Sequence, residues 1–160
     1  MNYQSNPAVL QNILASNAGV VSDGQIEMFQ SAGWHLWNND GFGYTDFEYC
    51  KMYQTRAENG HADYSLNVHL TIDWEGGEVY LMLGDNFGDG FNDEHYVGND
   101  GSPFNEQMER CIKAIRETAA NDPYLALIDS NPQAWADLVA AAERLGKVVG
   151  VPNPLHRYVA

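Results

Sequence analysis

Basic residues, cysteines and long hydrophobic runs are all scarce in this sequence. Its 160 residues include only 8 Lys and Arg against 22 Asp and Glu, which gives a formal net charge of −14. A chain this acidic is repelled by free nucleic acid and by anionic membrane surfaces, so we expect direct binding to neither. No stretch approaches the ~20 apolar residues of a membrane span. The first 20 residues contain no Lys or Arg, and we expect a cytoplasmic protein without a secretory signal.

The two cysteines, Cys50 and Cys111, lie far apart in the chain and form no CxxC pair or His/Cys cluster. This spacing gives no indication of a zinc site. We expect two buried, reduced thiols, with a single disulfide as the alternative. The chain also lacks the GxSxG, P-loop, GxGxxG and HExxH motifs, and no cofactor is expected.

Enough apolar sequence is present to build one hydrophobic core. Hydrophobic residues make up 44% of the chain and aromatic residues 12%, and the length fits a single domain over residues 1–160. Two short helices are predicted before residue 33, the second beginning with a capping box formed by Ser22 and Gln25. Three more helices are predicted between residues 102 and 146.

A first hairpin is predicted at Asp40-Gly41, a strong two-residue turn signal between two segments rich in aromatic residues. This turn would pair Leu36 with Thr45. All four tryptophans fall on apolar stripes or strands and are expected in the core. The alternative for Trp37, close to the turn, is an exposed position where it would anchor a partner.

The second hairpin has the clearest strand signal in the chain. Residues 64–74 alternate strictly between apolar and polar side chains, and a Gly-Gly pair then leads into a second apolar segment. A Gly-Gly turn would place Glu75 directly opposite Glu78, with Asp73 beside them. Because like charges that face each other destabilise a hairpin, its tip is a candidate binding surface.

Strands in one run and helices in another are typical of an α+β fold. We therefore predict a four-stranded antiparallel sheet, made of two hairpins, with two short N-terminal helices and about three C-terminal helices packed on one face. The long Gly- and Asp-rich segment 85–102 is predicted to be a loop. A face of the C-terminal helices could mediate a homodimer.

The negative charge is concentrated in the first two-thirds of the chain. Residues 1–109 hold 17 acidic and two basic residues, whereas residues 110–160 hold five acidic and six basic residues. No Lys or Arg occurs between Arg56 and Arg110, where twelve acidic residues occur. A field of one sign either keeps the protein in solution or attracts a basic partner.

The 85–102 loop also raises the possibility of a calcium site, because calcium prefers hard oxygen ligands such as carboxylates. An EF-hand match fails. In the register that puts Asp89-Gly90 at the sharp turn of an EF-hand loop, Phe87 and Tyr96 occupy positions that require acidic ligands. A calcium site of another kind, or a small-molecule site, is the alternative function.

An enzyme, such as a small hydrolase, is less expected. The triplet His69-Leu70-Thr71 resembles one half of the paired HxT signature of the two-histidine phosphoesterases, whose chemistry needs two facing motifs. No second HxT occurs in the chain. We therefore expect His69 to be a polar residue on the solvent face of its strand. We expect His35 to form a structural hydrogen bond with Asp46 opposite it.

We therefore expect a non-enzymatic binding protein that docks an acidic face on a basic partner. Proteins that handle nucleic acid commonly carry basic grooves, and an acidic face could compete for them as a nucleic-acid mimic. In size and charge the chain resembles the anti-CRISPR and antirestriction inhibitors of phages and plasmids, and the immunity proteins that block nuclease toxins. The candidate partner-binding residues are Asp73, Glu75, Glu78, Asp85, Asp89, Asp93, Glu94 and Asp100.

Overall fold

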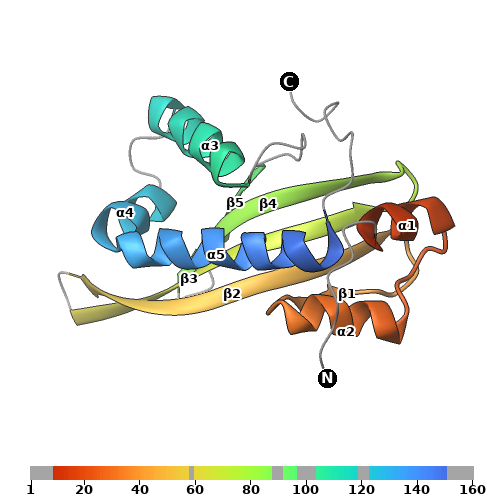
Figure 1. The fold of residues 1–160 in the computed structure, drawn as a ribbon. Coiled ribbons are helices and arrows are strands. Elements are labelled where there is room, and N and C mark those ends of the chain that lie inside the picture. Colours follow the sequence, from red (N-terminus) through yellow and green to blue (C-terminus); the bar gives the residue numbers. More distant parts are fainter. Residues whose placement is uncertain (1–8, 58–59, 88–91, 97–103, 119–122, 151–160) are drawn as a thin grey trace.

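The structure is a computed structural model that describes the backbone of residues 9–57, 60–87, 92–96, 104–118 and 123–150. Two short helices come first, then five strands, and three helices end the described chain (Figure 1). In chain order the elements are α1 (Val9–Ser16), α2 (Asp23–Ser31), β1 (His35–Asn38), β2 (Tyr44–Ala57), β3 (Gly60–Asp73), β4 (Glu78–Phe87), β5 (Asn92–Tyr96), α3 (Phe104–Thr118), α4 (Pro123–Ser130) and α5 (Pro132–Val149).

All five strands form one antiparallel sheet, in which each strand pairs with its neighbours in sequence. The predicted α+β class, with two N-terminal and three C-terminal helices, is confirmed. Segment 85–102 differs from the predicted loop, because β4 continues to Phe87 and β5 pairs with it. Backbone pairing along the edge of the sheet here outweighs the low strand propensity of Asn and Asp.

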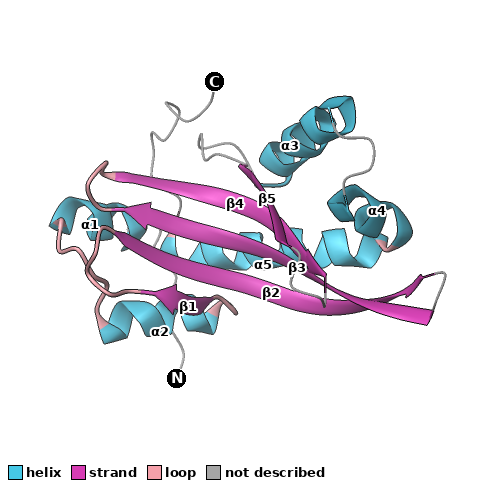
Figure 2. Ribbon diagram, turned by 180° about the vertical axis from the view of Figure 1, so that it is seen from behind, coloured by secondary structure: helices cyan, strands magenta, loops and turns pink. Residues whose placement is uncertain are grey.

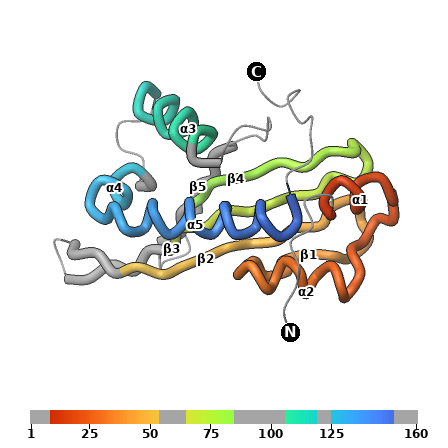
Figure 3. The backbone as a smooth tube through the Cα atoms, viewed as in Figure 1, coloured from red at the N-terminus to blue at the C-terminus, as the bar shows by residue number. Residues whose placement is uncertain are grey.

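The helices and the sheet form two layers. α5 runs along one face of the sheet (Figure 1), and the view from behind shows that no described helix covers the opposite face (Figure 2). α1 and α2 lie at the end of the sheet that carries the β3–β4 turn, whereas α3 and α4 lie toward the other end (Figure 3). None of the described helices is both long and apolar enough to cross a membrane.

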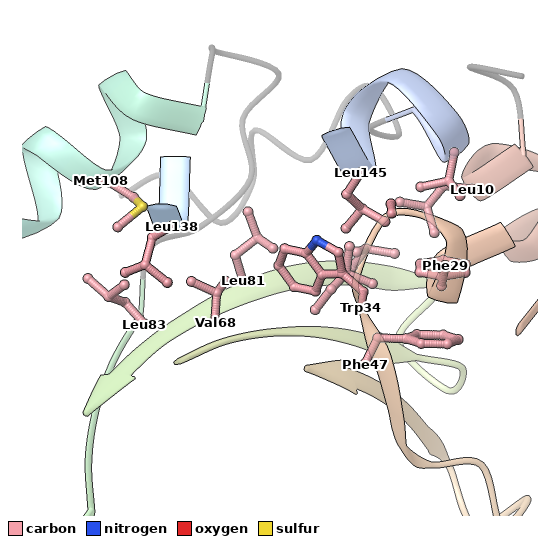
Figure 4. Packing of buried hydrophobic residues seen from close by; sticks show 14 of the residues in the cluster. Leu10, Phe29, Trp34, Phe47, Val68, Leu81, Leu83, Met108, Leu138 and Leu145 are labelled. Atoms are coloured by element: carbon pink, nitrogen blue, oxygen red, sulfur yellow. The ribbon is translucent and has the colours of Figure 1, made fainter. Parts of the chain in front are cut away.

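Trp34 packs between the sheet and α5 (Figure 4). Its side chain is fully buried, and its indole Nε1 donates a hydrogen bond of 3.0 Å to the carbonyl oxygen of Ala141 on α5. Next to it, Phe29 of α2 stacks on Phe47 of β2 with ring centroids 3.8 Å apart. These aromatic contacts connect the N-terminal helices, the sheet and the C-terminal helix in one core.

The β1–β2 connection is not the predicted two-residue turn. Leu36 pairs with Phe47 rather than with Thr45, and the register shifts at an irregularity later in β1. The side chain of Asn39 explains the longer loop: its Oδ1 accepts a hydrogen bond from the N–H of Val21 at 2.9 Å, and its Nδ2 donates to the carbonyl of Val21 at 3.0 Å. This contact fixes the loop to the α1–α2 connection.

Helix ends follow the sequence signals in part. The predicted capping box at α2 is confirmed: Gln25 Oε1 accepts from the N–H of Ser22 at 2.8 Å, and Ser22 Oγ accepts from the N–H of Gln25 at 3.3 Å. α5 was predicted to end at Gly146 but continues to Val149. It ends there because Gly150 has a φ of 72°, which favours glycine.

A group of polar contacts around Asp137 connects α5 to β2. Its Oδ2 accepts hydrogen bonds from Tyr53 Oη at 2.7 Å and from Lys51 Nζ at 3.0 Å. Gln133 Nε2 donates to its Oδ1 at 2.9 Å. These donors, Tyr53 first among them, lower the pKa of Asp137 to about 2.

We expect this carboxylate to make stability depend on acid pH. Its pKa in the unfolded chain is about 3.9, so its contribution is full above that value and is lost as the pH falls toward 2. Because the group is partly solvated, we expect a contribution of about 1–2 kcal/mol at neutral pH. Urea unfolding should show that Asp137→Asn costs about half as much at pH 3 as at pH 7. An equal cost at both pH values would contradict this assignment.

Candidate functional site

No described helix covers one face of the sheet (Figure 2). The register of β2, β3 and β4 places side chains in rows across this face. We call this surface the open face. Its rows are Tyr44 with Asp73 and Glu78, Asp46 with Thr71 and Tyr80, Glu48 with His69 and Met82, and Cys50 with Asn67 and Gly84.

The β3–β4 turn at the end of the open face is longer than the predicted Gly-Gly turn. Asp73 pairs with Glu78, so residues 74–77 form the turn and Glu75 lies within it rather than opposite Glu78. The N–H of Gly76 donates a hydrogen bond of 3.0 Å to the Asp73 carboxylate, a contact typical of such turns. The difference of two residues leaves every apolar side chain on its predicted face.

Three carboxylates, those of Asp46, Asp73 and Glu78, lie around Tyr80. Burial is the main cause of the raised pKa of Tyr80, and the charges of Tyr44 and of these carboxylates raise it further. The hydroxyl of Thr71 donates to Asp46 at 2.6 Å, which holds one of the carboxylates in place. This end of the open face is therefore a region of strong negative potential.

Asp46 and Glu48 were not among the predicted site residues. The prediction relied on the stretch without Lys or Arg, which begins after Arg56, and both residues precede it. A signal was present in β2, where Phe47 is a core residue. Because side chains alternate along a strand, the neighbours of Phe47 had to point to the opposite face.

A histidine, a carboxylate and an exposed aromatic ring meet near the middle of the open face. His69 Nε2 lies 2.7 Å from Glu48 Oε2, and the ring of Trp37 contacts the ring of His69 edge-on, with centroids 5.7 Å apart. Trp37 is 67% exposed, so the expected core position is wrong for this residue and the alternative holds. His35 pairs in register with Glu48, not with Asp46 as expected.

The β1–β2 loop is fastened to the β3–β4 turn. Thr45 Oγ1 donates to Asn39 Oδ1 at 3.0 Å and accepts from the indole Nε1 of Trp74 at 2.9 Å. Phe42, which is 85% exposed, projects from this loop. Beside it is an open pocket of about 350 Å³, lined by Asn17, Gly19, Gly41, Gly43, Trp74 and Glu75.

Of the predicted partner-binding residues, the three in and beside the β3–β4 turn have described side chains and lie together. Asp85 belongs to β4 and pairs with Asp93 of β5, and Glu94 pairs with Gly84. The side chains of Asp85, Asp93 and Glu94 are outside the described part of the chain, and Asp89 and Asp100 are outside it entirely.

Positive charge lies in the helical layer. α3, α4 and α5 carry five Lys and Arg residues and six Asp and Glu residues, which nearly balance. Among the strand side chains that the structure describes, Lys51 is the only Lys or Arg. It pairs with Asp137 of α5, on the helical side of the sheet. The described side chains of the open face therefore include carboxylates and no Lys or Arg.

The cysteines differ from the expected buried pair. Neither forms a disulfide, Cys111 is half-buried, and Cys50 is exposed on the open face. Desolvation of the sulfur and the nearby charge of Glu48 raise the pKa of Cys50, so its thiol is a weak nucleophile. In the described residues, no group of three or more His, Cys, Asp and Glu side chains is placed to hold a metal ion. The calcium alternative concerns the 85–102 segment, whose side chains are not described.

A second pocket, of about 330 Å³, lies in the helical layer and is lined by Glu109, Ile112, Lys113, Arg116, Ile128 and Trp135. It belongs to the C-terminal helices for which a homodimer contact was predicted, and that contact stays a prediction. No protein-family model, no curated protein and no solved structure matches the chain.

Proposed function

We propose that the protein is a non-enzymatic inhibitor that docks its open face on a basic surface of a protein that handles nucleic acid. The observation that carries the proposal is that the described side chains of the open face include carboxylates and no Lys or Arg, whereas the described helices carry both signs of charge. Carboxylates occupy the open face, and the described Lys and Arg side chains lie on the helical side. An acidic surface and a basic surface associate faster because they attract each other, and this attraction also favours the correct partner over others.

Exposed aromatic rings supply the apolar contacts that such an interface requires. Trp37 lies on the open face and Phe42 lies at its end, both largely exposed. Aromatic anchors surrounded by a polar rim are typical of protein–protein interfaces. The rings and the carboxylates together therefore favour a protein partner over a small ion.

The pairing of Asp73 with Glu78 supports the same proposal. Two carboxylates that face each other across neighbouring strands repel. A Lys or Arg from a partner placed between them would attract both. An enzyme is less well supported, because His69 is engaged with Glu48 and the Cys50 thiol is a weak nucleophile.

Capture from a cell lysate, with and without nuclease treatment, tests the proposal. We expect a basic protein to be retained in both cases, since its contact with the open face does not require nucleic acid. Its dissociation constant should rise at least about tenfold between 50 and 500 mM salt, because exposed charge pairs are screened. An affinity that does not change with salt, or retention that disappears after nuclease treatment, would count against the proposal.

The calcium alternative predicts a different result. Calcium that binds the native protein would raise its melting temperature in proportion to the logarithm of the calcium concentration. A thermal shift with calcium together with no retained basic protein would favour the alternative over the proposed inhibitor.

A further inference from the structure

A buried polar atom on the open face lacks a hydrogen-bond partner. Asn67 is only 6% exposed, and its side-chain oxygen Oδ1 accepts no hydrogen bond. Buried acceptors of this kind are rare in native proteins, because the loss of water is not compensated. The position therefore calls for a donor that the described part of the chain does not supply.

Because Asn67 Oδ1 has almost no exposed surface, its side chain must rotate outward to meet such a donor, and the neighbours of Asn67 give that donor a charge preference. Gly84, its register partner on β4, contributes no side chain. The next row of the open face holds Glu48 and His69, with the exposed ring of Trp37 against His69. A group that enters here meets an acceptor, a carboxylate and an aromatic ring.

These three features together select an arginine rather than a lysine. A guanidinium carries several N–H donors in one plane, so it can serve an amide oxygen and a carboxylate at the same time. It is more weakly hydrated than an ammonium group and stacks on aromatic rings. A lysine ammonium is a compact, strongly hydrated charge and loses more on desolvation.

We propose that the open face receives an arginine side chain of the partner, which donates to Asn67 Oδ1, pairs with Glu48 and packs against Trp37. This inference rests on the proposed function and specifies the chemistry by which the partner is recognised. It also accounts for an unsatisfied acceptor that a simple solubility surface would not require.

Two fluorescent peptides of equal length and charge, one an Arg-Gly repeat and the other a Lys-Gly repeat, test the inference by anisotropy. We expect the Arg-Gly peptide to bind at least about fivefold more tightly. Asn67→Leu should abolish this preference and leave Lys-Gly binding unchanged. Because the variant removes an unsatisfied buried acceptor, its melting temperature should rise by about 3 °C.

Thr71→Val is the matched control on the same strand and face. It removes a hydroxyl that already has a partner in Asp46, so we expect a lower melting temperature and an intact preference for Arg-Gly. If Asn67→Leu does not fold, NMR of the wild type decides: the Asn67 side-chain amide should shift on addition of Arg-Gly and stay unchanged on addition of Lys-Gly.

The outcomes separate this inference from the proposed function. Equal binding of both peptides, or no binding of either, overturns the arginine inference. The proposed function would still stand if a basic protein were retained in a salt-dependent manner. Loss of salt-dependent retention, with the Arg-Gly preference intact, would leave an arginine-binding site and remove the inhibitor proposal.

Discussion

The double variant Glu75→Lys/Glu78→Lys is expected to slow association with the retained partner at least about tenfold at low salt. Association between oppositely charged surfaces is accelerated by long-range attraction, and reversal of two charges at the centre of the field removes much of it. Stopped-flow or surface-plasmon kinetics at several salt concentrations would measure the change. The dissociation rate should change less, because charges at the rim of an interface act mainly on encounter.

A control variant with the same change in net charge is available in the helical layer. Glu117 of α3 and Glu143 of α5 are both exposed, and Glu117→Lys/Glu143→Lys should reduce the association rate much less. The open-face variant should also fold normally, since Lys at position 78 would face Asp73 and replace a repulsive pair by an attractive one. Equal slowing by both variants would show that net charge, and not the open face, controls binding.

Trp34→Ala is expected to lower the free energy of unfolding by about 3–5 kcal/mol, the usual cost of deleting a large core aromatic residue. Trp34 is fully buried, and its loss also removes the hydrogen bond to Ala141 that connects the residue before β1 to α5. Because small domains are stable by only about 5–15 kcal/mol, much of the folded state would be lost at elevated temperature. Urea unfolding followed by circular dichroism measures the cost.

Two comparison variants separate packing from hydrogen bonding. Trp34→Phe retains an aromatic ring but cannot donate to Ala141, and we expect it to cost about 1–3 kcal/mol. Trp37→Ala, at an exposed position on the open face, should change stability by less than about 1 kcal/mol while weakening partner binding. A cost for Trp34→Ala below that of Trp37→Ala would contradict the core assignment.

The faces of the strands could be predicted from the sequence, but their registers could not. The alternation of β3 identified which side chains face the helices, because period-2 patterning reports on the two faces of a strand. It did not predict that Ser65, Asn67 and Thr71 on the opposite face are buried as well. It does not distinguish registers that differ by two residues. The deciding contacts are side-chain hydrogen bonds: Asp73 with Gly76 in one turn and Asn39 with Val21 in the other.

Part of the candidate site was predictable and part required the pairing of strands. Asp73, Glu75 and Glu78 are consecutive with a recognisable turn, so local sequence was sufficient to group them. Asp46 joins that group only because β2 pairs with β3, and this pairing was not predicted. The unsatisfied oxygen of Asn67 depends on three-dimensional burial and has no signature in the sequence.

The order of the strands also has a consequence for how the chain folds. Because every strand pairs with its immediate successor, the sheet assembles by closing short loops, and such local topologies fold fast for their length. The bond between Trp34 and Ala141 spans 107 residues and requires the helical end of the chain. The strands can therefore pair with their neighbours locally, but the core beneath the acidic surface is closed only when the last helix packs on the sheet.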